Sequence, residues 1–436
     1  MFFKYNQFGA LQWNVADGAE LNLSSIASNP SITSPCYIYS QHLLEGHYLE
    51  LDNLFRSYFK SDDAYTICFS IKCCSNINIV RLLGGLGSGA DVVSGGEILR
   101  AKAAGIDMQK VVFAGVGKSR AEIELAIKSD ILQINAESFE ELEFINLVAG
   151  ELGARARVCL RMNPDIDAKT HSHITTGKKD NKFGIAYEQI ITELPSALKK
   201  FNNLDLNGFS THIGSQITEI APLEEVFFKL ANLSNHFTDL GYSIKTIDFG
   251  GGLGVQYGSE FVLPAADYAS VIFKAFKMLK SKPKLIIEPG RFIAARAGIL
   301  LAKVLYVKQS SGKKFVVLDA GMNDLIRPAL YDAKHLIFNL NNTAGSSGQE
   351  VYDVVGPVCE STCCFAKGVR LAKVQQGDVL AITNSGAYGS VMASRYNTRP
   401  LLGEYLIDKS LNIKTIRKPE TYEQIFANET LTTFDN

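Results

Sequence analysis

Lys72 could act as a nucleophile, because it closes an apolar, β-branched run at 64–71. Burial disfavours a charged ammonium and pushes a lysine toward the neutral amine that forms imines with carbonyl groups. Far downstream, two glycine-containing loops at 250–254 and 288–291 could hold a phosphate beside that amine. A lysine near a phosphate pocket indicates a cofactor that carries both an aldehyde and a phosphate, and pyridoxal phosphate fits both requirements.

The first of these loops, Gly250 to Gly254, has a competing interpretation as a plain turn. Glycines let backbone N–H groups approach phosphate oxygens, and Arg291 in the second loop could add charge-assisted donors. The first loop follows an apolar run at 246–249, which favours the phosphate interpretation. Residues 85–90 match the spacing of a dinucleotide fingerprint, but they follow a predicted helix and precede a strand, which is the wrong order.

Three polar residues near predicted strand ends could bind a flat cofactor. Glu288 could hold a proton on a pyridine nitrogen, and the alternative is a salt bridge with Arg291 or Arg296. His212 could stack on the ring while Ser215 reaches the phosphate. A single histidine on a strand is more often a core residue with satisfied hydrogen bonds, and His212 taken alone favours that interpretation.

Cys359 and Glu360 follow an apolar run at 354–358 and form a possible proton donor and binding pair. A thiol can give or take a proton when its surroundings suit the working pH, and an adjacent carboxylate could bind a substrate ammonium. The alternative is a buried, inert thiol, which describes most free cysteines. Spacing alone leaves both interpretations open.

Composition and charge exclude several classes of protein. The 436 residues are 46% hydrophobic and 20% charged, and the formal net charge of −1 gives no one-signed field for nucleic acid or an anionic membrane. No stretch resembles a signal peptide or a transmembrane helix, so we expect a cytoplasmic protein with no membrane partner. The eight cysteines match no zinc spacing, so we expect no metal site.

Between residues 36 and 290, short apolar runs alternate with segments of helical period, which is typical of repeated β/α units. Eight runs predict strands, at 66–72, 90–94, 111–115, 132–136, 157–163, 206–214, 246–251 and 285–290. Intervening segments predict helices, among them 95–104, 119–128, 138–152, 222–240 and 266–280. Eight β/α units in roughly 250 residues predict an α/β fold of the TIM (β/α)8 barrel type.

Beyond Arg291 the sequence predicts strands without long helices. These strands are expected at 301–309, 314–321, 349–358 and 377–384. Residues 1–35 are too short to fold alone, and we expect them to add strands to the same domain. The barrel at 36–290 is therefore predicted to be inserted into a second, all-β domain, sandwich-like or barrel-like, made of 1–35 and 291–436.

Taken together, these segments resemble the fold III (alanine-racemase-type) pyridoxal phosphate decarboxylases, most closely the diaminopimelate decarboxylases. The resemblance covers nearly the whole chain, and the order and spacing of its motifs are far more specific than any single motif. The motifs are FSIK (69–72), GSGADVVSGGE (87–97), HIGSQ (212–216), DFGGGLG (248–254), EPGR (288–291), DAGMNDLIRPALY (319–331), GPVCES (356–361), SGAYG (385–389) and YNTRP (396–400).

The resemblance implies a pyridoxal 5'-phosphate site at the mouth of the barrel. By this resemblance Lys72 is bonded to the cofactor aldehyde, Asp91 lies near that bond, His212 covers the ring face and Glu288 meets the pyridine nitrogen. The remaining cofactor contacts that the resemblance implies are Ser215, Gly252, Gly290, Arg291 and Tyr388.

The resemblance also implies a substrate site shared between two subunits of a homodimer. Cys359 corresponds to the proton donor, and it reaches the site from the other subunit. Residues that correspond to substrate contacts are Arg291, Arg327, Tyr331, Glu360 and Tyr388.

Two departures from the family pattern are visible. Where such enzymes usually have Lys-Ala-Asn, this chain has Lys72-Cys73-Cys74, and where they usually have Glu-Ser-Gly-Asp, it has Glu360-Ser361-Thr362-Cys363. Neither departure removes an acid, a base or a ligand from the implied site. Loss of a carboxylate at Cys363 could alter the loop that carries Cys359.

The activity implied by the resemblance is decarboxylation of meso-2,6-diaminopimelate to L-lysine and carbon dioxide, the last step of lysine biosynthesis. Arg327 suits a distal carboxylate and Glu360 a distal ammonium, so both signs of a zwitterionic far end are matched. Alternatives are a decarboxylase of ornithine, arginine or carboxynorspermidine, an amino-acid racemase, and a non-catalytic binding relative. Retention of Lys72 and Cys359 argues against the binding relative, and the Arg327 segment fits a racemase poorly.

Overall fold

The structure is a computed structural model that describes residues 3–6, 9–16, 19–167, 176–177, 181–340 and 348–432. The chain divides into two compact units, Glu45–Ile293 and a second unit made of Met1–Leu44 with Ala294–Asn436. The first unit therefore interrupts the second in the sequence. This division differs from the expected limits of 36 and 290, and the larger difference arises because β4 (Cys36–Ser40) pairs with strands of the second unit.

Eight parallel strands close into a barrel in the first unit. They are β5 (Tyr65–Ser70), β6 (Gly89–Val92), β7 (Val111–Phe113), β8 (Gln133–Ala136), β9 (Ala156–Asn163), β11 (Leu204–Ser210), β12 (Thr246–Asp248) and β13 (Lys284–Ile287). β13 pairs with β5, and β8 pairs with β9, so the ring has no free edge. β10 (Ile185–Ala186) adds a short parallel pairing to β9. Each predicted strand is present, and the prediction of a TIM barrel is confirmed.

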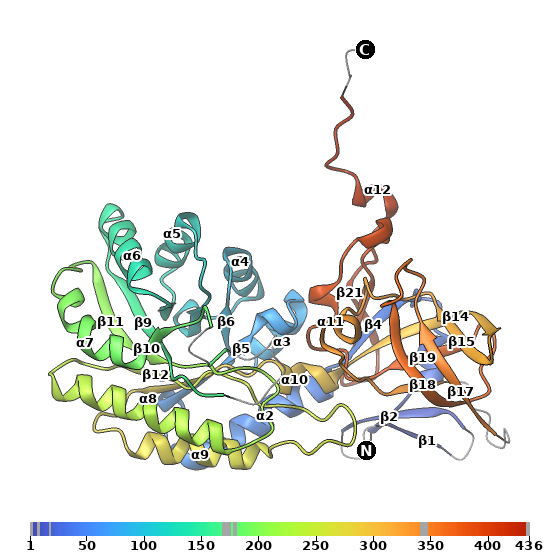
Figure 1. Cartoon of the computed structure of the whole chain (residues 1–436), viewed down its shortest axis with the longest axis horizontal. Coiled ribbons are helices and arrows are strands. Elements are labelled where there is room, and N and C mark those ends of the chain that lie inside the picture. The colour runs from blue at the N-terminus through green and yellow to red at the C-terminus, as the bar shows by residue number, and fades with distance from the viewer. Residues whose placement is uncertain are drawn as a thin grey trace. The chain divides into compact units, whose positions relative to one another are not determined.

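Helices alternate with these strands along the sequence and flank them in space, with α2 before the first strand and α10 after the last (Figure 1). They are α2 (Gln41–Tyr58), α3 (Ile77–Gly84), α4 (Gly95–Ala104), α5 (Arg120–Lys128), α6 (Phe139–Glu151), α7 (Tyr187–Leu198), α8 (Ala221–Asp239), α9 (Ala265–Lys277) and α10 (Arg291–Ala294). Side chains of Ser94, Ser119 and Ser138 accept backbone N–H groups in the first turns of α4, α5 and α6. These caps fix the turns that follow β6, β7 and β8, at the end of the barrel where the strands' carboxyl ends meet.

A mixed sheet forms the body of the second unit, as the strand-rich sequence predicted. Its path runs through β18 (Cys364–Ala372), β17 (Gln349–Val355), β15 (Lys313–Leu318), β14 (Gly298–Ser310), β4, β20 (Gly403–Ile407) and β21 (Ile413–Arg417). β19 (Val379–Ile382) pairs with both β14 and β16 (Ile337–Asn339). Short helices α1 (Leu23–Ala27), α11 (Arg327–Tyr331) and α12 (Tyr422–Ile425) belong to the same unit.

The amino-terminal strands form a small sheet of their own within the second unit. β1 (Phe3–Tyr5), β2 (Leu11–Ala16) and β3 (Ala19–Asn22) pair in that order. Phe3 stacks on Phe338 with ring centroids 5.7 Å apart, and the Ser24 hydroxyl donates to the carbonyl of Leu340 at 2.8 Å. The first residues therefore contribute strands as expected, but they do not extend the main sheet.

No helix in the described part of the chain is long and apolar enough to cross a membrane.

Gly208 in β11 gives a test of how closely the barrel strands pack. A Cβ atom at this position would lie 1.9 Å from the Thr246 carbonyl oxygen on β12, so a side chain would force the strands apart. We expect Gly208→Ala to lower the free energy of unfolding by about 1 to 3 kcal/mol, the range for overpacked cores. Urea denaturation followed by circular dichroism measures this change.

Gly46 supplies the matched control, because it is exposed in α2 and a Cβ there would meet no atom within 4 Å. We expect Gly46→Ala to raise the free energy of unfolding by about 0.5 to 1 kcal/mol, since alanine favours helix. Equal denaturation midpoints for the two variants would contradict the described packing.

Candidate active site

Lys72 lies just beyond β5, in a single 3-10 turn spanning Ile71–Cys73, and not inside the strand as the sequence predicted. Its Nζ donates to Oδ2 of Asp91 at the end of β6, and the Ser70 hydroxyl donates to the same oxygen at 2.7 Å. The Lys72 side chain is 29% exposed, whereas the Asp91 side chain is completely buried. The turn thus carries the amine toward the barrel mouth while its counter-ion stays in the interior.

Two further carboxyl groups are buried at the same mouth. Burial, followed by the neighbouring Asp248 and Asp91 charges, raises the pKa of Glu288 well above its usual range. Burial also raises the pKa of Asp248 to about 6, and a hydrogen bond joins its side chain to that of Glu288. Oε1 of Glu288 and Oδ1 of Asp91 are buried without a hydrogen-bond partner in the described part of the chain. The mouth therefore retains a proton among its acids and offers a buried oxygen to a ligand N–H group.

Asp248 was not singled out from the sequence, although it opens the DFGGGLG motif. Its two carboxylate oxygens accept hydrogen bonds, one from the Gly250 N–H at 2.9 Å and one from Nδ2 of Asn135 at 3.3 Å. Asn135 in turn accepts from Gln133, which accepts from the Thr246 hydroxyl, at 2.8 and 2.7 Å. β8 and β12 are not neighbours in the barrel, so this buried chain of hydrogen bonds crosses its interior and holds Asp248 in place. Spacing in the sequence gives no signal for such a contact.

The glycine loop after β12 packs against neighbouring loops through its backbone alone. A Cβ atom on Gly251 would lie 2.2 Å from the Glu288 carbonyl oxygen, and one on Gly252 would lie 2.7 Å from the Gly214 carbonyl oxygen. Gly250 and Gly252 also have positive φ, at 66° and 110°. These contacts and φ angles exclude any residue other than glycine at the three positions, so the loop can pack this closely only with glycine.

Arg291 and Ser215 come together beside this loop. The Arg291 guanidinium donates to the Ser215 hydroxyl at 3.0 and 3.2 Å and to the Tyr257 hydroxyl at 2.8 Å, and it is 7% exposed. Gly290 precedes it, and a Cβ atom there would lie 2.9 Å from the Ser70 Cβ, close to the Lys72 turn. Tyr257 was not predicted as a site residue.

His212 follows β11, and its Nδ1 accepts the Gly251 N–H at 3.3 Å. Burial, together with the Arg161 and Lys72 charges, lowers the pKa of His212 well below its usual range. The ring is therefore neutral and carries its proton on Nε2. Arg161 also donates to the His212 carbonyl at 3.0 Å and to Glu137 at 2.8 Å, which anchors the loop after β11.

The other predicted site residues belong to the second unit. Cys359 and Glu360 lie exposed after β17, so the thiol is not buried as the alternative interpretation held. Its Sγ donates to Oδ1 of Asn397 at 3.5 Å, and the Tyr396 hydroxyl donates to Oε1 of Glu360 at 2.6 Å. Tyr388 adopts a left-handed conformation with φ of 56°. Asn397 and Tyr396 were quoted only as part of a motif, and the structure assigns them contacts.

Arg327 and Tyr331 lie at the two ends of α11. Arg327 is 5% exposed, and its Nη1 lies 3.1 Å from Nε2 of the equally buried His335. Tyr331 is partly exposed. His335 was not predicted as a site residue.

The residues at both departures from the family pattern, Cys73-Cys74 and Cys363, pack within the protein. Cys73 and Cys74 are buried, and Cys73 packs against the position of Gly290. Cys363 is also buried, and its Sγ accepts the Met322 N–H at 3.3 Å. Its backbone N–H donates to the Glu360 carbonyl at 3.0 Å, so hydrogen bonds close the loop after Cys359 without a carboxylate at 363.

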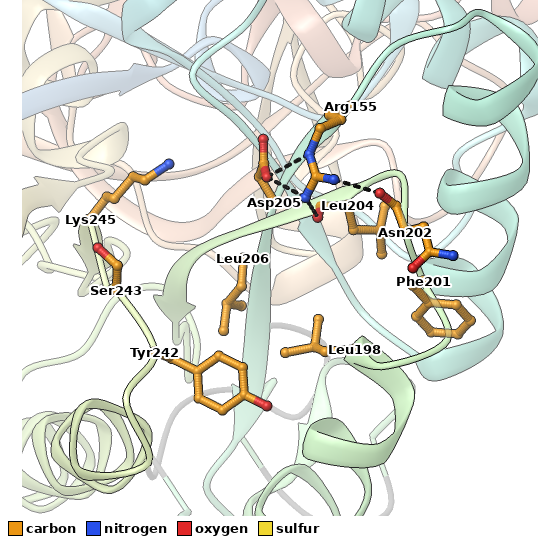
Figure 2. Close-up of a pocket in the computed structure, with 10 residues that line it drawn as sticks. All are labelled: Arg155, Leu198, Phe201, Asn202, Leu204, Asp205, Leu206, Tyr242, Ser243 and Lys245. Atoms are coloured by element: carbon orange, nitrogen blue, oxygen red, sulfur yellow. Dashed lines mark hydrogen bonds and ion pairs between the residues drawn. The ribbon is translucent and has the colours of Figure 1, made fainter.

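A cavity of about 460 Å³ opens at the opposite, amino-terminal ends of β9, β11 and β12 (Figure 2). Figure 2 shows the Arg155 guanidinium bonded to Asp205 and to the carbonyls of Asn202 and Leu204. Its donors are thus already used within the protein, and reactive groups in such barrels lie at the other end. Within the described ranges, no group of three His, Cys, Asp or Glu side chains could hold a metal ion.

Known proteins resemble this chain over most of its length. A family model described as pyridoxal-dependent decarboxylase, pyridoxal binding domain, matches residues 50–295. A diaminopimelate decarboxylase of Aquifex aeolicus is 41% identical over 393 residues, which cover 90% of this chain and 90% of that protein. One of Vibrio cholerae is 40% identical over 430 residues, which cover 99% of each chain.

Solved structures give the same result. The diaminopimelate decarboxylase of Helicobacter pylori, in a crystal structure complexed with L-lysine, has a TM-score of 0.87 to this chain at 41% identity. The match covers 94% of this chain and 99% of that one.

The buried acid pair predicts how stability of the cofactor-free protein changes with pH. Folding raises the pKa of Asp248 from 3.8 to about 6. The contribution of this carboxyl group to stability is therefore fully present below pH 3.8. That contribution is lost as the pH rises through the folded-state pKa of about 6. Between about pH 4 and pH 7, we expect the free energy of unfolding of the wild type to fall by about 1 to 3 kcal/mol relative to that of Asp248→Asn. Urea titrations across this range measure the difference.

Thr246→Val is the control for this experiment, because it removes a hydrogen bond from the same chain of polar contacts without removing a titrating group. We expect it to lower stability equally at every pH. A wild-type pH slope that matches the Asp248→Asn slope would contradict the acid-pair description.

Proposed function

This chain belongs to the diaminopimelate decarboxylase family of pyridoxal-dependent decarboxylases, and from that premise we propose that it converts meso-2,6-diaminopimelate to L-lysine and carbon dioxide. This is the last step of lysine biosynthesis. The observation that carries the proposal is the barrel mouth, where Lys72, buried acids and a glycine loop meet. A decarboxylase of ornithine, arginine or carboxynorspermidine remains the alternative among enzymes.

The residues at the mouth fit pyridoxal 5'-phosphate. When bound, this cofactor supplies an electron sink for the pair of electrons that carbon dioxide leaves behind. Lys72 would form the covalent attachment, with Asp91 as its counter-ion. The unpartnered Oε1 of Glu288 would meet the pyridine nitrogen, and its raised pKa supports a proton held at that contact. The neutral His212 ring would cover one face of the cofactor without adding a charge.

The phosphate would lie against the loops after β11, β12 and β13. Gly252 and Gly290 sit where no side chain fits, so backbone N–H groups can reach the oxygens. Arg291 and Ser215 add side-chain donors beside them. Tyr388 would contact both cofactor and substrate, and its strained backbone supports such a role.

The distal end of the substrate would be bound by groups of both signs. Arg327 suits its carboxylate because a guanidinium binds a carboxylate through two parallel hydrogen bonds, and Arg291 and Tyr331 would assist. Glu360, held by the Tyr396 hydroxyl, suits its ammonium group. Substrates that lack one of the two charges would be bound less well.

Cys359 would return a proton to the carbon that has lost its carboxylate. Its exposed thiol supports a role at a surface that a second copy of the chain covers. We therefore include in the proposal a homodimer in which Cys359 and Glu360 complete the site of the partner. We also place the enzyme in the cytoplasm, which suits eight free cysteines.

The proposal is tested by replacing Lys72 and Cys359 one at a time. We expect Lys72→Ala to lower carbon dioxide release from meso-diaminopimelate by about a thousandfold or more, because the covalent attachment is lost. Cys359→Ser should lower the rate by about 100-fold or more, since a hydroxyl is a much weaker acid than a thiol. Lysine formation and near-visible absorption of the bound cofactor are measured together.

Purified wild-type protein provides the control, with ornithine, arginine and carboxynorspermidine as competing substrates. Faster carbon dioxide release from one of these three than from meso-diaminopimelate would reject the proposed specificity. A colourless protein that stays colourless with added cofactor would favour a binding role.

The shared site gives a separate test, because Lys72→Ala and Cys359→Ser damage different parts of it. When the two variants are unfolded together and refolded as a mixture, half of the dimers should contain one copy of each. Each of these dimers holds one intact site, so we expect activity to recover to about a quarter of the wild-type value. No recovery beyond the sum of the two separate variants would show that each chain completes its own site.

A further inference from the structure

We propose that His335 is a positioning residue for substrate recognition, which holds Arg327 in the orientation that binds the distal carboxylate of the substrate. The inference rests on the proposed function and deepens it by naming the group that orients the arginine. His335 touches the guanidinium and would not itself contact the reacting atoms.

The fold brings the two side chains together over a short loop. Arg327 opens α11, which ends at Tyr331, and the left-handed conformation of the next residue, Asp332, with φ of 51°, reverses the chain. The Ala333 N–H then donates to the Arg327 carbonyl, which closes the turn. His335 follows, and its Nε2 lies 3.1 Å from Nη1 of Arg327. Each of the two side chains is only 5% exposed, so the contact forms in the interior of the unit.

The second nitrogen of the His335 ring defines its protonation state. Nδ1 lies 2.8 Å from the backbone carbonyl oxygen of Thr383. A carbonyl only accepts hydrogen bonds, so Nδ1 carries the ring proton. A guanidinium nitrogen only donates, so Nε2 must be unprotonated and accept from Arg327. The two contacts are satisfied together by a neutral ring in one tautomer.

The main sheet fixes the position of this ring. The backbone N–H and the hydroxyl of Thr383 both donate to the carbonyl of Leu336, at 3.0 and 3.1 Å. β16 begins at the next residue, Ile337, and pairs with β19, which ends just before Thr383. The direction of the guanidinium is therefore set by the sheet before a substrate arrives, and preorganisation of this kind strengthens binding.

A neutral acceptor suits this role better than an acid would. It fixes one nitrogen of the guanidinium while leaving the positive charge of Arg327 intact. A carboxylate at position 335 would orient the arginine equally well, but it would cancel the charge that a substrate carboxylate needs. His335 therefore controls direction without competing with the ligand.

Two ligands separate this role from a general effect on the site. L-lysine keeps the amino-acid end that Arg327 would bind, whereas cadaverine, 1,5-diaminopentane, is the same chain without the carboxylate. Loss of arginine orientation should weaken lysine binding and leave cadaverine binding unchanged. Isothermal titration calorimetry of the cofactor-loaded enzyme measures both dissociation constants.

We expect His335→Phe, which keeps a ring and removes the acceptor, to weaken L-lysine binding about tenfold, the effect of one lost charge-assisted hydrogen bond. Cadaverine binding should change less than about twofold. For meso-diaminopimelate, KM should rise by about tenfold with kcat changed less than about twofold, because the lost interaction acts far from the reacting carbon.

Two further substitutions keep the proposal testable if the phenylalanine variant folds poorly. In His335→Asn, the side-chain N–H can still donate to Thr383, but the shorter side chain places no acceptor at the former Nε2 position beside Arg327, so the same loss of lysine binding is expected. In His335→Gln, the amide oxygen lies near the former Nε2 position and should restore most of the lysine affinity. A ratio of two dissociation constants does not depend on the fraction of active protein, so partial misfolding cannot imitate the result.

An unchanged ratio of lysine to cadaverine affinity in both His335→Phe and His335→Asn would overturn the inference, as would an equal loss for both ligands. A different result would contradict the proposed function. In that case the wild type itself would bind lysine no more tightly than cadaverine, or would release no carbon dioxide from meso-diaminopimelate.

Discussion

Closure of the parallel barrel imposes the constraint on which the cofactor site depends. The carboxyl ends of all eight strands meet at one mouth, and there Asp91, Asp248 and Glu288 are buried close to one another. Lys72 forms an ion pair with Asp91, one of these three acids. Because the interior has a low dielectric constant, the three carboxyl groups cannot all be ionised beside that one cation. A proton is therefore retained, and the raised pKa values of Glu288 and Asp248 reflect that necessity. In the proposed cofactor site, a ring nitrogen at this mouth would meet an acid group that already holds a proton.

Backbone hydrogen bonds join the glycine loop after β12 to the segment that carries Glu288. The Glu288 N–H donates to the Gly250 carbonyl at 2.8 Å, and the Phe249 N–H donates to the Ile286 carbonyl at 3.0 Å, which extends the β12–β13 pairing past both strand ends. Gly251 lies so close to Glu288 that only glycine fits. A shift of the glycine loop would therefore move Glu288 as well, so strand pairing would set the distance between the two ends of a cofactor bound as proposed.

The barrel could be predicted from the sequence because its strands are buried on both faces and appear as continuous apolar runs. The prediction that Lys72 ends the strand was wrong, because β5 ends at Ser70. The last residues of that run turn into a 3-10 helix, and only this turn brings the amine to Asp91. Asp248 was missed because its partner Asn135 is 113 residues away, and such a contact exists only after the barrel has closed. His335 was missed for a different reason, since a histidine eight residues after Arg327 gives no periodic signal once a left-handed residue has ended the helix.

The partly exposed Lys72 and the buried Arg327 have opposite kinds of partner, and we relate this difference to the role proposed for each cation. In the barrel, Lys72 forms an ion pair with the Asp91 carboxylate, which would suit the proposed role of an amine that loses its charge and exchanges protons with its surroundings. In the second unit, a guanidinium never loses its charge, so the protein can only direct it. His335 directs Arg327 with a neutral nitrogen, which leaves the cation's attraction for a carboxylate undiminished at that contact. An acid partner is thus the arrangement that a reacting amine such as Lys72 would require. A neutral partner is the arrangement that a binding guanidinium such as Arg327 would require.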